Sequence, residues 1–60
     1  MIPDFSRTYK GYKIDHYRCT GVWSITRPVS GKFFERVEYV AYSFSESSCI
    51  EYIDAILKES

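Results

Sequence analysis

Three side chains of this sequence have the residue types for metal binding or nucleophilic catalysis: His16, Cys19 and Cys49. A structural zinc ion needs about four ligands and a catalytic one about three, within a compact pattern. These residues fall in a predicted strand, loop and helix, so they form no metal signature. A cysteine–histidine nucleophile also needs an orienting group and an oxyanion site in a pocket, which so small a domain hardly offers. The sequence therefore predicts no enzyme, no metal and no cofactor.

The carboxylates and glycines give no second candidate for chemistry. The carboxylates stand singly at positions predicted to be exposed, and none pairs convincingly for acid–base work. Gly11, Gly21 and Gly31 recur about once per predicted strand or turn, so they punctuate hairpins and do not cradle a phosphate. We therefore expect the protein to act by binding.

Length and composition predict one small folded domain. The chain has 60 residues, among them six Tyr, four Phe and one Trp. Each aromatic ring can bury ~150–250 Å², so a few of them can supply most of a small core. The two cysteines, without a leader of secretory type, are interpreted as reduced thiols of a cytoplasmic protein. A Cys19–Cys49 disulfide is the alternative. No apolar run approaches the ~20 residues that span a membrane, so no membrane partner is expected.

The charges balance over the whole chain but not along it. The formal net charge is zero, while residues 1–36 sum to +4 and residues 37–60 to −4. A neutral total argues against a dominant phosphate-binding role. The uneven distribution predicts a charge dipole that could orient a partner.

Alternating patterns predict three antiparallel strands, with residues 1–8 as a loose N-terminal arm and 9–60 as a single domain. The first strand covers 9–18, and Gly11 near its start indicates a bulge or a close backbone approach. A three-residue loop with Gly21 at a positive φ then leads to a second strand over 22–27. Pro28 is expected to end that strand because it cannot donate to the ladder.

The third strand, over 33–42, has apolar side chains on both faces. One face carries Phe33, Val37, Tyr39 and Ala41, interrupted by Glu35, and the other carries Phe34, Val40 and Tyr42, interrupted by Arg36 and Glu38. Either a bulge switches the pairing midway, or the second sheet face is itself partly apolar. The sequence leaves both alternatives open.

A C-terminal helix is predicted to about Lys58. Ser43 and Glu46 fit a capping box, and Ser45 is an alternative cap. Apolar residues at helical spacing form one stripe, which consists of Cys49, Ile50, Ile53, Ile56 and Leu57.

These elements predict an α+β domain, a three-stranded antiparallel meander with the helix packed on one face. The expected sheet side of the core is Tyr12, Ile14, Trp23, Ile25, Val37, Tyr39 and Ala41. Aromatic residues and arginine are enriched in protein interfaces, so the uncovered face is the predicted binding surface. Its predicted partner-binding residues are Tyr17, Val22, Arg36, Val40 and Tyr42. Ordinary exposed tyrosines on a solvated face are the alternative.

The segments YKGYKI, GVWSI, KFFERVEYVAYSF and SESSCIEYIDAIL give a layout that resembles small β-β-β-α proteins encoded by bacteriophages and prophages. The resemblance covers nearly the whole chain. The layout is also similar to the arm-binding domains of tyrosine recombinases and to AP2-type DNA-binding domains. That similarity implies a sheet in the DNA major groove, with contacts from Lys13, Arg18, Ser24, Thr26, Arg27 and Arg36.

Two functions follow as expectations. The first is a small non-enzymatic protein that modulates a host or phage protein by contact through the uncovered sheet face. It would act in the host cytoplasm, as a monomer or a weak homodimer. The alternative is a double-stranded DNA-binding module, from which the sequence departs because Asp15 and Glu38 are expected on the reading face.

Overall fold

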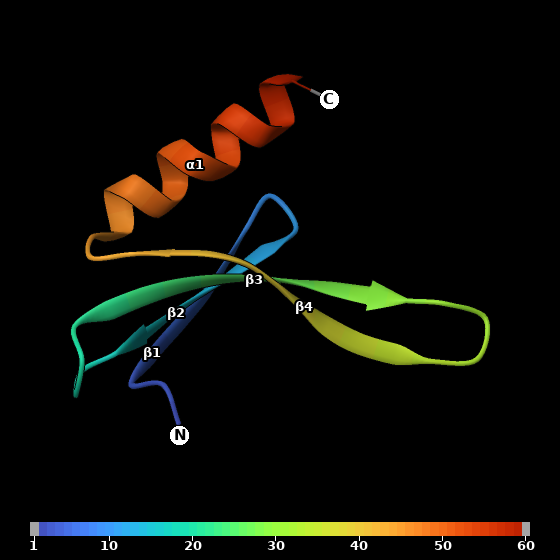
Figure 1. Cartoon of the computed structure of the whole chain (residues 1–60), viewed down its shortest axis with the longest axis horizontal. Coiled ribbons are helices and arrows are strands. Elements are labelled where there is room, and N and C mark those ends of the chain that lie inside the picture. Colours follow the sequence, from blue (N-terminus) through green and yellow to red (C-terminus); the bar gives the residue numbers. More distant parts are fainter. Residues whose placement is uncertain (1, 60) are drawn as a thin grey trace.

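The computed structural model describes residues 2–59 and contains four strands and one helix. Met1 and Ser60, which bound the predicted arm and domain, lie outside these residues. The elements are β1 (Phe5–Tyr9), β2 (Tyr12–Tyr17), β3 (Val22–Ser30), β4 (Glu35–Ser43) and α1 (Glu46–Glu59). The strands form one antiparallel sheet in the order β1-β2-β3-β4, and α1 lies on one of its faces (Figure 1). The α+β class is compatible with this arrangement, but the predicted three-stranded meander is wrong.

The additional strand is β1, formed by residues that the sequence predicted as a loose arm. Tyr9 pairs with Tyr12 across a two-residue turn. Both turn residues have positive φ, 48° for Lys10 and 88° for Gly11, as in the mirror-image turns whose twist suits a hairpin. Gly11 therefore closes a hairpin and does not mark a bulge.

In addition to the ladder with β2, exposed ion pairs link β1 and the turn that follows it to the helix. Arg7 lies 3.1 Å from the Glu46 carboxylate, and Lys10 lies 3.0 Å from that of Asp54. The Tyr9 hydroxyl donates a second hydrogen bond to Asp54, at 3.0 Å. The hydrogen bond from Lys10, followed by that from Tyr9, holds the pKa of Asp54 below its ordinary value. The same Asp54 carboxylate raises the pKa of Lys10.

The turn between β2 and β3 spans residues 18–21. The Tyr17 carbonyl accepts hydrogen bonds from the amides of Thr20 and Gly21, at 3.2 and 2.8 Å. Gly21 has a φ of 73°, as the sequence predicted, although the loop is one residue longer than expected.

β3 continues through Pro28, so the predicted strand end at this residue is wrong. The last pair between β3 and β2 joins Thr26 to Lys13, and beyond it β3 has a neighbour on one side only. The Gly31 amide donates to the Phe34 carbonyl at 2.8 Å, so these two residues form a hydrogen-bonded pair. Hydrogen-bonded and non-hydrogen-bonded pairs alternate along an antiparallel ladder, and this alternation makes Pro28 and Val37 a non-hydrogen-bonded pair. Pro28 therefore lies in a pair that needs no donor toward β4, and its nitrogen faces the vacant side. Residues 27–38 form an arm that extends beyond the helix (Figure 1).

A β-bulge at Val40 decides between the two alternatives for the last strand. Thr26 pairs with Tyr39 and Ile25 pairs with Ala41, so Val40 is the extra residue. Val40 packs against the core together with its neighbour Ala41. Because one residue is inserted, the faces exchange, and Val37 and Tyr39 lie on the side away from α1. The prediction that these two residues belong to the core is wrong.

The helix begins after Ser45, whose hydroxyl accepts a hydrogen bond from the Ser48 amide at 3.3 Å. Ser45, the alternative cap in the sequence, is therefore the residue that caps the helix. Ile53 and Cys49 are fully buried against the sheet, whereas Leu57 is 39% exposed. The buried hydrophobic core consists of Tyr12, Ile14, Ile25, Cys49 and Ile53. Over residues 2–59, no helix has both the length and the apolar character needed to cross a membrane.

Candidate functional site

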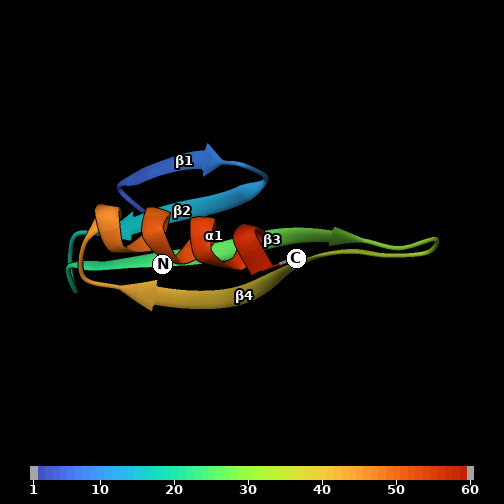
Figure 2. The ribbon, with the colours of Figure 1, turned by 90° about the horizontal axis from the view of Figure 1, so that it is seen from above.

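The face of the sheet away from α1, here called the open face, is the candidate site. Strand register and side-chain alternation assign its members, since paired residues share a face and the bulge at Val40 shifts the assignment by one. Figure 2 shows α1 over the opposite face, with β1 and β4 at the two edges of the sheet. The open face carries Ser6, Thr8, Lys13, Asp15, Tyr17, Val22, Ser24, Thr26, Pro28, Ser30, Glu35, Val37, Tyr39 and Tyr42.

Large apolar side chains on this face are exposed along β4. The exposed fractions are 66% for Val37, 59% for Tyr39 and 60% for Tyr42. Tyr42 packs edge-on against Phe44, with 6.1 Å between the ring centroids. Alternate residues of a strand project from the same face, and the extra residue at Val40 keeps Tyr42 on the same face as Val37 and Tyr39. These side chains therefore form a row along one strand.

A hollow of about 150 Å³ lies beside this row. Its lining includes Thr8 and Lys13 from the first hairpin, Thr26 from β3, and Pro28 and Val37 from the arm. Pockets for small molecules usually measure ~300–1,000 Å³. The hollow therefore suits an inserted side chain better than a cofactor or a metabolite.

A larger hollow, of about 380 Å³, lies along the arm itself. It is lined by residues of both strands, including Val29 and Arg36 from the helix side. The arm extends past α1 and is exposed on both faces, so this hollow is open to solvent.

Asp15 is a buried carboxylate on the open face. Its side chain accepts a hydrogen bond from the Ser6 hydroxyl, and the register places it between Ser6 and Ser24. Burying a charged group is costly unless it is hydrogen-bonded. This contact ties β1 to β2 and marks the polar part of the open face.

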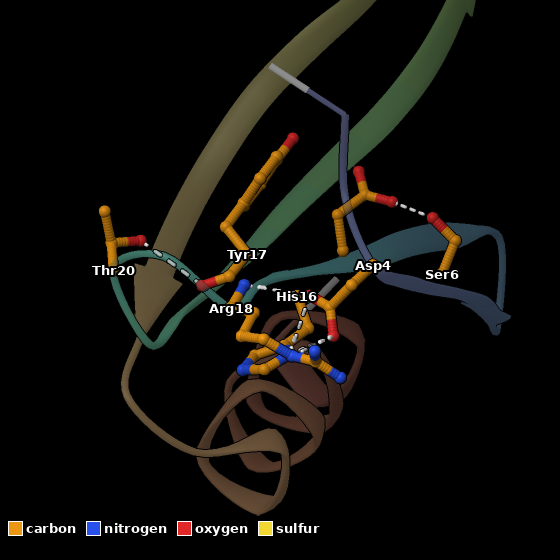
Figure 3. Close-up of polar contacts among 7 residues, drawn as sticks. Asp4, Ser6, His16, Tyr17, Arg18 and Thr20 are labelled. Atoms are coloured by element: carbon orange, nitrogen blue, oxygen red, sulfur yellow. Dashed lines mark hydrogen bonds and ion pairs between the residues drawn. The ribbon is translucent and has the colours of Figure 1, made fainter.

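A polar cluster of Asp4, His16 and Arg18 lies on the other side of β2 (Figure 3). The Asp4 carboxylate lies 3.1 Å from His16 Nδ1 and accepts a hydrogen bond from the Arg18 amide at 2.8 Å. Partial burial alone would raise the pKa of Asp4, but the hydrogen bonds from His16 and the Arg18 amide hold it below its ordinary value. The His16 ring also stacks on Trp23, with centroids 4.3 Å apart. The cluster fastens the N-terminal segment to β2.

His16, Cys19 and Cys49 do not come together in the described chain. His16 makes its contacts to Asp4 and Trp23, Cys19 is exposed in the turn, and Cys49 lies buried against the Trp23 carbonyl. Both cysteines are free thiols. Within residues 2–59, no group of three or more His, Cys, Asp or Glu side chains is placed to hold a metal ion.

Three of the five predicted partner-binding residues lie together on the open face. Tyr17 pairs with Val22, and Tyr42 pairs with Ser24; Figure 3 shows Tyr17 projecting from β2 on the side opposite His16 and Arg18. Arg36 and Val40 do not join them, because the bulge places both on the helix side. That part of the predicted arrangement is wrong.

Val37 and Tyr39, which the sequence assigned to the core, are the large apolar residues of the open face that sequence reasoning missed. Glu35, on the same face, breaks their apolar pattern, whereas Arg36 and Glu38 occupy the other face of the arm. Charged residues interrupt both faces of this strand in the sequence, so their presence does not show which face turns away from the helix. Only the position of the bulge relative to Ile25 decides which face they occupy.

The residues proposed for DNA contact are divided between the two faces. Lys13, Ser24 and Thr26 lie on the open face, whereas Arg27 and Arg36 lie on the other, and Arg27 pairs with Glu38 at 3.1 Å. Arg18 directly follows the last residue of β2 and lies beside Asp4. The sheet therefore does not gather these side chains on one surface.

This chain was compared with family models, with curated proteins and with solved structures, and no match was found in any of the three comparisons.

Proposed function

We propose that the protein is a small non-catalytic module that binds a partner protein through the open face. The observation that carries this proposal is the row of exposed Val37, Tyr39 and Tyr42 on the sheet face opposite α1. Single exposed apolar residues are normal, but a contiguous row in so small a domain is typical of an interaction surface.

The chemistry of the row supports a protein partner. Tyrosine is enriched in interfaces because it has a large apolar ring and a polar hydroxyl group. Tyr17 and Val22 lie on the same face, and the hollow beside Val37 offers a place for one inserted side chain. Resemblance to phage-encoded proteins makes a host or phage protein in the host cytoplasm the expected partner, and this origin stays a prediction.

Capture with matched variants tests the proposal. Immobilised wild-type protein, Tyr39→Ala, Tyr42→Ala and the control Tyr52→Ala would be exposed to the same lysate, and bound proteins identified by mass spectrometry. Tyr52 is an exposed tyrosine on α1, away from the open face. We expect a partner that the wild type and Tyr52→Ala both retain and that the two open-face variants lose. Identical capture by all four proteins would refute the open face as the binding surface.

Duplex DNA is the contrasting partner. Binding that weakens steeply with salt and on Arg27→Ala substitution would indicate phosphate contacts. Since the sheet divides the basic side chains, we expect no such binding at low salt.

A further inference from the structure

The outer edge of β4 is a row of free backbone groups in the described chain. β4 is the last strand of the sheet, and among residues 2–59 Figure 2 shows no other element along its outer side. The hydrogen bond from Gly31 to Phe34 fixes which residues face β3. Successive residues of a strand point their N–H and C=O groups alternately toward one neighbour and away from it. Since Phe34 faces β3, the backbone groups of Glu35, Val37 and Tyr39 point outward. Such an edge is a template for another strand.

We propose that a second copy of this chain pairs with that edge, antiparallel along residues 35–39, about a two-fold axis at Val37. In this arrangement Val37 lies opposite Val37 of the second copy, and Glu35 lies opposite Tyr39. All the residues that exchange backbone hydrogen bonds are then ones whose groups point outward. The proposal is independent of the open-face function, because it uses the strand edge.

The two-fold axis could be centred on any of the five residues 35–39, and charge complementarity favours the position at Val37. Centres at Glu35, Arg36 or Glu38 place a residue opposite its own like-charged copy, which destabilises an antiparallel pair. A centre at Tyr39 brings the bulge at Val40 into the paired segment. The centre at Val37 alone sets Arg36 opposite Glu38 of the second copy, and it does so twice.

Arg36 and Glu38 are both exposed, so each can reach a second copy. Within residues 2–59 Arg36 makes no ion pair, and its guanidinium lies 5.5 Å from the Phe34 ring. Glu38 already accepts from Arg27 at 3.1 Å. In the pair of chains, each Glu38 would lie between Arg27 of its own chain and Arg36 of the other. The pairing is short, so the dimer should be weak and reversible.

Sedimentation equilibrium of the purified chain, at concentrations up to about 1 mM, tests this pairing. We expect the wild type to dimerise as concentration rises. Arg36→Glu and Glu38→Arg should each weaken dimerisation by about tenfold or more, because the two-fold axis counts each change twice. An equal mixture of the two variants should form a heterodimer, since every like-charged pair then becomes an opposite-charged one.

Lys13→Glu is the matched control, because it makes the same change in charge as Arg36→Glu on β2, away from this edge. It should dimerise like the wild type, and circular dichroism would establish that each variant is folded. A wild type that stays monomeric throughout would overturn the proposal. So would a dimer that is indifferent to Arg36→Glu, or a mixture that fails to associate. Because no other protein is present, these outcomes leave the open-face proposal untouched.

Discussion

Pro28 lies opposite Val37 at the point where β3 has lost its other neighbour, β2. The pairing tolerates proline because the missing donor would face the vacant side. It also puts both side chains on the open face, next to the hollow of about 150 Å³. The arm is therefore a continuation of the sheet that the helix does not cover, and its apolar side chains are available to a partner.

Truncation of a buried isoleucine should remove most of the stability of the domain. Ile53 is fully buried between the helix and the sheet. Large-to-small changes at such sites cost about 2–5 kcal/mol for Ile→Ala and about 0.5–1.5 for Ile→Val. A domain of this size has a stability of only a few kcal/mol. Urea unfolding should show Ile53→Val destabilised and Ile53→Ala largely unfolded.

The exposed neighbour Tyr52 is the control for that series. Its substitution by Ala should change the free energy of unfolding by less than about 0.5 kcal/mol. Equal losses for Tyr52→Ala and Ile53→Ala would contradict the way α1 packs on the sheet.

The pair between Lys10 and Asp54 should make stability depend on pH at both extremes. Lys10 and Tyr9 lower the pKa of Asp54 from 3.8 in the folded state, so this contribution is present above that value and lost as pH falls through the folded pKa. Asp54 raises the pKa of Lys10 from 10.5, so the other contribution is present below that value and lost as pH rises through the folded pKa.

Thermal unfolding of the wild type and Asp54→Asn from acid to alkaline pH would measure this dependence. The variant should lose the Asp54 part of the acid decline and the Lys10 part of the alkaline decline. Since both side chains are exposed, the effect should be small and should shrink in high salt. Superimposable pH profiles for the two proteins would argue against the pair.

The two cysteines should differ sharply in reactivity. Burial, together with the nearby Glu46 charge, raises the pKa of Cys49, whereas Cys19 is exposed in the β2–β3 turn. The thiolate is the reactive form. A thiol reagent should therefore modify one cysteine quickly in the native protein and the second only in denaturant. Cys19→Ser should abolish the fast phase, and a fast phase that survives this substitution would contradict the burial of Cys49.

The helix and the central strands could be predicted because their signals are local. The apolar stripe around Ile53 repeats at helical spacing, and the alternation around Ile14 and Ile25 has period two. These three residues are fully buried. Local pattern and tertiary packing agree there.

β1 was missed although its signal is local, because Gly11 was interpreted as a bulge or a close backbone approach and not as part of a hairpin turn. The passage of β3 through Pro28 and the bulge at Val40 could not be predicted for the opposite reason. Pro28 is tolerated only because β2 has already ended, and the role of Val40 depends on which residue pairs with Ile25. Each feature depends on a distant partner. For the same reason the sequence placed Tyr17, Val22 and Tyr42 on one face but missed Val37 and Tyr39.

The affinity of a captured partner for Tyr39→Ala and for Tyr52→Ala, measured by calorimetric titration, tests the central claim most directly. Truncation of an aromatic anchor in an interface often costs about 2 kcal/mol or more, roughly thirtyfold in affinity. We predict a loss of about tenfold or more for Tyr39→Ala, with Tyr52→Ala close to the wild type. Equal affinities for both variants and the wild type would contradict the open face as the binding surface.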